Sequence, residues 1–255
     1  MKLDELLSIM TDVASANRLG KPFMVGGVPR DRIIGKRGKI SGIKDIDITT
    51  GDKSSLVLAE ALHRKLPNSS YRTYDDGHSS VDFRGIHIDF SSNFIAPGVQ
   101  EELRKMNVKD VDSMKLELYS RDFTMNTLLE SLDFTTIYDL TGEAIGDIQA
   151  GTIRCPINPE ITIGVDPRRI LRAIKFAVRF GFKIDDKLKT TMLNNKNRIQ
   201  DLPVKFVRDK INEIVLIDND EGIEKLIEYK ILPLVPLTKT VSDMLIQKRR
   251  LSRAL

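Results

Sequence analysis

The sequence predicts an α+β fold in which a mixed part of helices and strands, ending near residue 150, precedes an all-helical part. Three observations lead to this prediction. Apolar and polar residues alternate at 45–49 and 79–91, as they do in strands with one buried face. Beyond residue 167, apolar residues recur only at helical spacing. A run dense in turn-forming residues, 139–154, lies between the two patterns.

The expected elements of the first part follow from periodicity and from glycine punctuation. Apolar residues among the first fourteen positions recur three or four apart, which predicts an amphipathic helix. The short apolar run at 22–25 predicts a strand that is ended by Gly26 and Gly27. The remaining expectations are a helix over 28–34, a strand over 45–49, a helix over 54–66, a hairpin over 79–91, an irregular stretch with one helical patch over 91–120, and a helix that starts at Arg121.

The second part is expected to contain four successive helices and a short basic tail. We therefore predict a head domain, a helical neck and a C-terminal segment, with boundaries 1–150, 151–235 and 236–255. The four helices are expected at 167–180, 186–199, 203–217 and 220–230.

The bulk composition is ordinary for a globular protein of 255 residues, with 41% hydrophobic and 30% charged residues. The 40 basic and 36 acidic residues leave a net charge of +4, which favours an anionic partner only weakly. Cys155 is the single cysteine and so cannot form an internal disulfide. No stretch approaches the ~18 uninterrupted apolar residues of a membrane span. We therefore expect a cytoplasmic protein without a membrane partner.

Asp45 and Asp47 are separated by one residue within the strand expected at 45–49. Side chains two apart on a strand share a face, about 7 Å apart along the chain, so these carboxylates repel one another. A divalent cation relieves that repulsion, and Mg²⁺ takes carboxylate oxygens together with water and substrate phosphate. The pair therefore predicts a Mg²⁺ site for a phosphate substrate. A solvated strand face is the alternative interpretation of the same spacing.

Gly26 and Gly27 form a turn between the first expected strand and the helix at 28–34. Glycine lets the backbone approach a ligand because no Cβ intervenes, and a helix start presents N–H groups to an anion. Arg30 lies in the first turn of that helix, within reach of a triphosphate. The alternative is a plain strand-to-helix connection in which Arg30 and Asp31 pair on the surface. A dinucleotide-binding oxidoreductase is excluded because no G-x-G-x-x-G occurs here.

The helix expected at 167–180 combines an ordinary start with a stripe of cations. Asp166 as the cap and Pro167 at the first helical position need no ligand to explain them. Four cations then recur at steps of four, three and four with no interleaved acid, which suits an RNA phosphate backbone. Solvated cover over an apolar helix is the alternative. The four residues are Arg168, Arg172, Lys175 and Arg179.

Five segments in chain order, between about residues 23 and 232, resemble motifs of one enzyme family. It is the class II tRNA nucleotidyltransferase (CCA-adding) and bacterial poly(A) polymerase family, part of the DNA polymerase β-like nucleotidyltransferase superfamily. The last segment is the loosest match. The segments are "MVGGVPRDRIIG" with "DIDIT", "RDFTMNTL", "YDLTGEAIGDIQAGTIR", "DPRRILRAIKFAVRFGF" and "VKFVRDKINEIVLIDNDEGIEKLIEYKIL".

This resemblance implies a polymerase β-like head followed by an all-helical neck, with body and tail domains largely absent. It implies that Asp45 and Asp47 ligate two Mg²⁺ ions. Asp89 is the candidate for a third catalytic carboxylate, with Asp82 on the neighbouring strand as the other choice. Asp166 and Arg169 would pair with the edge of the incoming base. The full implied nucleotide-binding set is Gly26, Gly27, Arg30, Arg121, Asp122, Asn126, Asp166 and Arg169.

The function implied is template-independent addition of C and/or A to tRNA 3′ ends, with CTP and ATP as substrates. CC-only addition, A-only addition and poly(A) tailing share the same motifs. A non-catalytic RNA-binding relative is the alternative from another class. Family members normally continue into domains that grip tRNA, so we expect RNA contact from the basic helix, the tail, a second copy of the chain in a homo-oligomer, or an additional protein.

Overall fold

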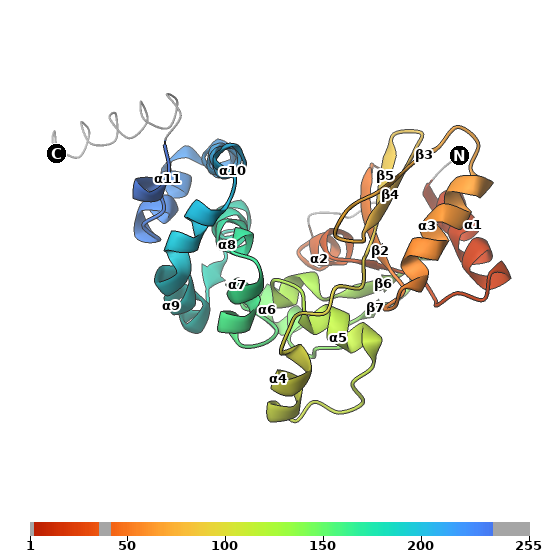
Figure 1. The fold of residues 1–255 in the computed structure, drawn as a ribbon, viewed down its shortest axis with the longest axis horizontal. Coiled ribbons are helices and arrows are strands. Elements are labelled where there is room, and N and C mark those ends of the chain that lie inside the picture. Colours follow the sequence, from red (N-terminus) through yellow and green to blue (C-terminus); the bar gives the residue numbers. More distant parts are fainter. Residues whose placement is uncertain (1–2, 36–41, 237–255) are drawn as a thin grey trace. The chain divides into compact units, whose positions relative to one another are not determined.

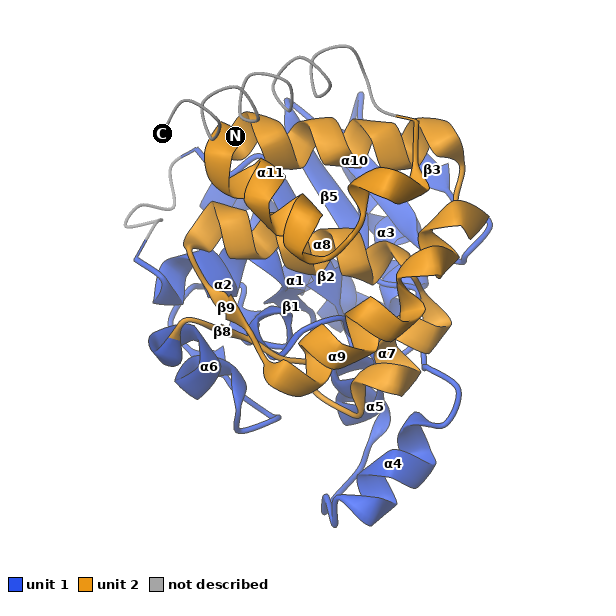
Figure 2. Ribbon diagram, turned by 90° about the vertical axis from the view of Figure 1, so that its left-hand side faces the viewer, with its two compact units in different colours: residues 1–150 blue, residues 151–255 orange. Residues whose placement is uncertain are grey.

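The computed structural model describes residues 3–35 and 42–236. Contacts divide the chain into two compact units, residues 1–150 and 151–255 (Figure 2). The predicted basic tail lies outside the described residues from position 237 onward. No helix in the described ranges has both the length and the apolar character needed to cross a bilayer.

In the described part of the first unit, seven strands form one sheet in the order β3-β4-β5-β2-β1-β6-β7. Strands β2 and β5 run parallel, and the other neighbouring pairs are antiparallel. The bounds are β1 Phe23–Val25, β2 Asp45–Thr49, β3 Ser70–Thr73, β4 Ser79–Phe83, β5 Ile86–Phe90, β6 Leu129–Ser131 and β7 Ile137–Tyr138.

One face of this sheet packs against two helices, α1 (Leu3–Ala16) and α3 (Ser54–Lys65), which lie side by side (Figure 1). The strict alternation in β2 explains why, since Ile46 and Ile48 turn toward the helices while Asp45 and Asp47 turn away. The core on this side is made of Leu6, Leu7, Met10, Met24, Ile46, Ile48, Leu58, Leu62, Val81, Ile88 and Phe90, with further apolar neighbours.

The opposite face is covered only in part. Helix α5 (Ser113–Tyr119) places Leu118 against Val25 and Leu129, which forms a second, smaller core over β1 and β6. The face of β2, β5 and β4 beside it carries polar side chains. The other helical elements of this unit are α2 (Gly27–Ile33), α4 (Val99–Lys105), η1 (Thr124–Asn126) and α6 (Ala144–Ala150).

The structure confirms the strand at 45–49 and the hairpin at 79–91, but the helix predicted from Arg121 is wrong. That segment forms the short turn η1 and then β6, because Leu129 pairs with Val25 at the open edge of β1. Tertiary pairing has overridden a helical pattern of apolar residues. The polar strand β3 was not predicted, since its sequence, "SYRT", lacks apolar alternation.

The second unit is largely helical, as the sequence predicts. The expectation of no further strand is wrong, because Thr152–Ile153 (β8) pairs in parallel with Lys183–Ile184 (β9). Helix α7 (Pro159–Val165) was also not predicted, although Asn158 caps it and Pro159 occupies its first turn. The other elements are α8 (Arg168–Phe180), α9 (Asp186–Asn195), η2 (Lys196–Asp201), α10 (Val204–Ile217), α11 (Asn219–Glu228) and η3 (Leu232–Leu234).

Candidate active site

The polar face of the sheet carries side chains in register across three strands. Residues that pair between neighbouring strands point to the same face, so each register pair forms part of a row. Asp47 on β2 pairs with Asp89 on β5, which brings the two carboxylates side by side. Asp45 pairs with His87, one step earlier along both strands. The rows across β2, β5 and β4 are Asp45, His87 and Asp82, followed by Asp47, Asp89 and Ser80.

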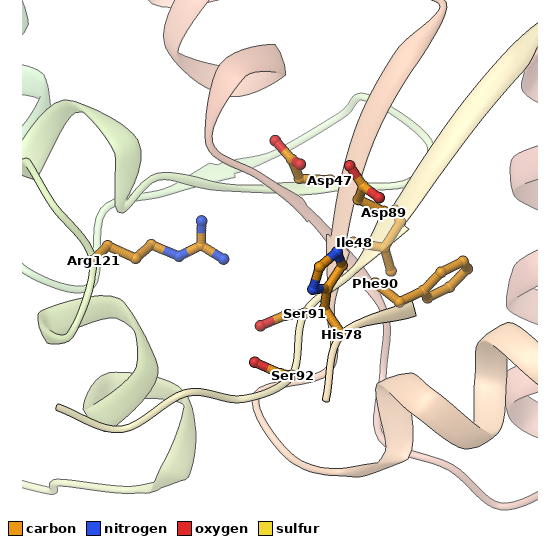
Figure 3. A pocket seen from close by; sticks show the side chains of 8 residues that line it. All are labelled: Asp47, Ile48, His78, Asp89, Phe90, Ser91, Ser92 and Arg121. Atoms are coloured by element: carbon orange, nitrogen blue, oxygen red, sulfur yellow. The ribbon is translucent and has the colours of Figure 1, made fainter. Parts of the chain in front are cut away.

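The second of these rows opens into a cavity of about 280 Å³. Asp47 and Asp89 both line it, whereas Asp45 and Asp82 do not. Figure 3 shows the guanidinium of Arg121 on the side of the pocket opposite these two carboxylates. The remaining lining residues are Ile48, His78, Phe90, Ser91 and Ser92.

Gly26 brings the backbone against this site. Its φ of 75° lies in the left-handed region, which glycine adopts without strain. A Cβ at this position would stand 3.1 Å from Oδ2 of Asp47 and 3.7 Å from Nη1 of Arg121. The glycine therefore permits a close approach that any side chain would block. The neighbouring Gly27 has a φ outside that region and begins α2.

Arg30 lies in a buried network and not on the surface. Its Nε and Nη2 donate to Oδ1 of Asp31 at 2.8 and 2.7 Å, and its Nη1 donates to Oδ1 of Asn126 at 2.7 Å. Asn126 in turn donates to Oδ1 of Asp122 at 2.9 Å. The structure thus brings together three residues of the predicted nucleotide-binding set, from two motifs far apart in sequence. The surface pairing of Arg30 and Asp31 is excluded, because both side chains are buried.

His87 connects the two candidates for a third carboxylate. Its Nδ1 lies 2.6 Å from Oδ1 of Asp82, and its Nε2 lies 3.1 Å from Oδ1 of Asp89. The hydrogen bond to Asp82 raises the pKa of His87, and the nearby Asp89 carboxylate acts in the same direction. The same bond lowers the pKa of Asp82. Of the two acids, Asp89 is the one beside Asp47 at the pocket.

The residues present fit a magnesium ion as a pair of carboxylates. Among the described residues there is no group of three or more His, Cys, Asp or Glu side chains arranged to hold a metal. Mg²⁺ does not need such a cage, since it is commonly bound through one or two carboxylates with water and substrate phosphate. Asp47 and Asp89, in register at one cavity and beside a backbone without Cβ, provide that arrangement.

Two features of the pocket were not predicted from the sequence. His78 lines the pocket and stacks on Tyr74, with ring centroids 3.9 Å apart. Glu117 is buried beneath the pocket wall and accepts a hydrogen bond from Arg121. The spacing of four between Glu117 and Arg121 was the available signal for that pair. Nothing local in the sequence signals His78, because its position depends on the turn between β3 and β4.

In the second unit, Asp166 and Arg169 sit at the junction of α7 and α8. Oδ1 of Asp166 accepts from the backbone N of Arg168 at 2.9 Å and from its Nε at 2.8 Å. The prediction of Asp166 as the cap and Pro167 as the first helical residue is wrong by one position, because Pro167 is the N-cap and α8 begins at Arg168. Arg169 is 9% exposed, and its Nη1 donates to the carbonyl of Thr162 at 3.3 Å. Both side chains therefore have structural partners inside their own unit.

The four cations of α8 lie on the side of the helix away from its buried apolar residues. Arg168, Arg172 and Arg179 are exposed, and Lys175 is half-buried. Lys175 forms an ion pair with Glu213 of α10, and Arg168 forms one with Asp166. The stripe predicted from spacing is present, but an acid from a neighbouring helix approaches one of its members.

Comparison with known proteins agrees with the motif resemblance. The family described as the poly(A) polymerase head domain matches residues 22–154. An A-adding tRNA nucleotidyltransferase of Geobacter sulfurreducens is 30% identical over 203 residues, which cover 76% of this chain and 21% of the relative. Poly(A) polymerase I of Salmonella typhimurium is 28% identical over 230 residues, which cover 86% of this chain and 48% of the relative.

A solved structure of a CCA-adding enzyme in complex with CTP has the same fold, with a TM-score of 0.68 and 25% identity. The match covers 89% of this chain and 50% of that protein. The chain thus spans about half, or less, of the length of the proteins it resembles. These relatives include tRNA nucleotidyltransferases and a poly(A) polymerase.

Proposed function

This chain belongs to the poly(A) polymerase head-domain family, and from that premise we propose that it is a template-independent RNA 3′-end nucleotidyltransferase. Its substrates would be CTP and/or ATP and the 3′ end of a tRNA. The observation that carries the proposal is the register of Asp47 and Asp89 at one cavity, with Gly26 against them and Arg121 opposite. A nucleotidyltransferase needs this combination of acid and base, because it must bind both a metal and a triphosphate.

The reaction requires positioning and charge neutralisation more than covalent chemistry. The 3′-hydroxyl oxygen of the RNA bonds to the α-phosphorus while the bond from that phosphorus to the bridging oxygen breaks. The bond's electron pair leaves with pyrophosphate, and the hydroxyl proton passes to solvent. Two magnesium ions, when bound, would activate the hydroxyl and stabilise the leaving group. Asp45, Asp47 and Asp89 would hold these ions, and Arg121 would contact the nucleotide.

The second unit would supply base choice and RNA affinity. Asp166 and Arg169 would read the edge of the incoming base, since a carboxylate accepts from an exocyclic amine and a guanidinium donates to a ring nitrogen or carbonyl. Arg168, Arg172, Lys175 and Arg179 would contact the RNA backbone. Gly27, Arg30, Asp122 and Asn126 would shape the nucleotide pocket around the buried network described above.

The test is incubation of the full chain with tRNA lacking its 3′ end, labelled CTP or ATP, and Mg²⁺. Asp47→Asn combined with Asp89→Asn should lower the transfer rate by roughly 10³-fold, since two of the three proposed metal ligands lose their charge. Asp12→Asn, an exposed position on α1, is the matched control and should retain wild-type activity. Transfer by the double variant at the wild-type rate would reject this active site.

The same experiment separates the related activities. Sequencing the 3′ ends of the products distinguishes CCA, C-only and A-only addition from poly(A) tailing. The specific alternative from another class is a non-catalytic RNA-binding protein. Retention of labelled RNA without extension by any nucleotide would favour that alternative.

A further inference from the structure

Glu117 is the most deeply buried acid near the pocket, with 2% of its surface exposed. Three side chains donate hydrogen bonds to it. Oγ1 of Thr49 lies 2.6 Å from Oε2, while Oγ of Ser91 and Nη2 of Arg121 lie 2.9 and 2.8 Å from Oε1. Such a complete set of donors is what allows an ionised carboxylate to be buried at acceptable cost.

The three donors come from three different segments of the chain around the pocket. Thr49 ends β2, two residues after Asp47. Ser91 follows β5, two residues after Asp89, and lines the pocket itself. Arg121 forms the opposite wall. Glu117 therefore joins the strand ends that carry both pocket carboxylates to the arginine that faces them.

The charge of Glu117 needs its own explanation. Asp47 and Asp89 already place negative charge at this face, so a further acid nearby is unfavourable unless a cation compensates it. A neutral side chain of the same shape would satisfy Thr49 and Ser91, since hydroxyl groups both donate and accept. Only Arg121 requires a negative partner. The acid at position 117 is therefore explained by the arginine.

The orientation of Arg121 follows from this contact. Nη2 is bound by Glu117, while Nη1 lies 3.7 Å from where a Cβ of Gly26 would stand. One end of the guanidinium is thus fixed in the protein, and the other end lies next to the glycine turn beside Asp47. A planar guanidinium held at one edge has a fixed plane and direction, which suits the recognition of an anionic group.

We propose that Glu117 is a positioning residue that holds Arg121, at a fixed separation from Asp47 and Asp89, to receive the triphosphate of the incoming nucleotide. This inference rests on the proposed function, because it concerns the same pocket. Glu117 touches neither nucleotide nor RNA in this role and acts through Arg121. Its loss should therefore affect nucleotide binding and leave RNA binding unchanged.

The primary test is Glu117→Gln, which keeps the shape and removes the charge. KM for CTP or ATP should rise about tenfold or more, the size expected for one charge-assisted hydrogen bond, while tRNA affinity stays the same. In an Arg121→Ala background the same change should add less than about twofold, because its target is gone. Glu60→Gln, which breaks an exposed ion pair on α3, is the matched control and should not alter KM.

Three results would overturn the inference. One is a folded Glu117→Gln protein with wild-type KM and an altered melting temperature only. Another is an undiminished rise in KM in the Arg121→Ala background. If the glutamine variant does not fold, the shorter side chain of Glu117→Asp moves the carboxylate away from Arg121 instead. A wild-type KM in that variant would also contradict the proposal.

A failure of the proposed function can be told apart from a failure of this inference. If the wild type transfers no nucleotide, calorimetric titration with CTP and ATP still compares the wild type with Glu117→Gln. Weaker binding by the variant supports the positioning role without any transfer. Equal binding overturns it.

Discussion

The acidic pocket of the first unit and the basic face of α8 in the second unit hold their charges in different ways. In the first unit, Glu117 and Arg30 are buried and each forms hydrogen bonds with more than one side chain. On α8, the arginines of the stripe are exposed along a helix whose other side forms a core. Buried charge is expensive to disturb, whereas exposed charge acts mainly through the field that it adds at the surface. Mutations should therefore lower stability in the first region and RNA affinity in the second.

The strongest test of this contrast is Arg30→Met. The change removes the cationic donor that Asp31 and Asn126 share, in a site where Arg30 is only 5% exposed. Breaking a buried ion pair by removing one partner costs about 3 kcal/mol or more. We expect the free energy of unfolding of the full chain, measured in urea, to fall by that amount.

Arg64→Met is the matched control, because Arg64 pairs with Glu60 on the exposed side of α3. An exposed pair of this kind contributes less than about 1 kcal/mol, so the control should be almost as stable as the wild type. Equal losses of unfolding free energy in the two variants would show that the buried Arg30 network stabilises the fold no more than an exposed ion pair does. Unchanged stability with a raised KM would instead assign Arg30 to the triphosphate alone.

The second test is the salt dependence of RNA binding by the α8 stripe. Replacing Arg172 and Arg179 with alanine should weaken RNA affinity and reduce the slope of log K against log salt by about 1.5, since each lost phosphate contact removes roughly 0.7 to 0.9. The guanidinium groups of both exposed arginines also lie over aromatic rings of their own helix, Arg172 over Phe176 and Arg179 over Phe180. Filter binding at several salt concentrations measures the slope.

Lys175→Ala offers an internal comparison on the same helix. Its ammonium group pairs with Glu213 and its side chain is half-buried, whereas Arg172 and Arg179 are exposed, so Lys175 should contribute less to the slope than either arginine. A double arginine variant with an unchanged slope would identify the stripe as solvated cover. If Lys175→Ala lowers the slope as much as the loss of one arginine does, the smaller contribution expected of Lys175 is wrong.

The strand carrying Asp45 and Asp47 could be predicted to the residue because its alternation is a local property. The same holds for the hairpin that carries Asp89. Both patterns result from one buried face, which the sequence records directly. The choice of Asp89 over Asp82 could not be made this way, since it depends on the parallel pairing of β2 with β5.

The segment from Arg121 shows the limit of local reasoning. Its apolar residues follow a helical spacing, yet Leu129 pairs with Val25, about a hundred positions earlier in the chain. The contacts of Glu117 are equally non-local, because Thr49 and Ser91 are distant in sequence from α5. The motifs could thus name candidate residues such as Asp47 and Arg121, but His78, Glu117 and the interactions around them required the fold.

The smallest expected effect concerns the ion pair between Lys189 and Glu228 in the second unit, which is only partly buried and has no proposed role in RNA binding. A hydrogen bond from Lys189 lowers the pKa of Glu228, and Lys225 adds to the shift against the effect of partial burial. A carboxyl group whose pKa is lower in the folded state contributes stability above its unfolded pKa, and that contribution is lost as the pH falls through the folded value. Because the side chain is about one third exposed, the contribution should be only about 0.5 kcal/mol. Glu228→Gln should therefore be slightly less stable than the wild type in urea at about pH 7, and the difference should shrink as the pH falls through the lowered pKa of the wild-type carboxyl and vanish once that carboxyl is protonated. A difference that persists or grows in acid would mean that Glu228 stabilises α11 through packing and not through its charge.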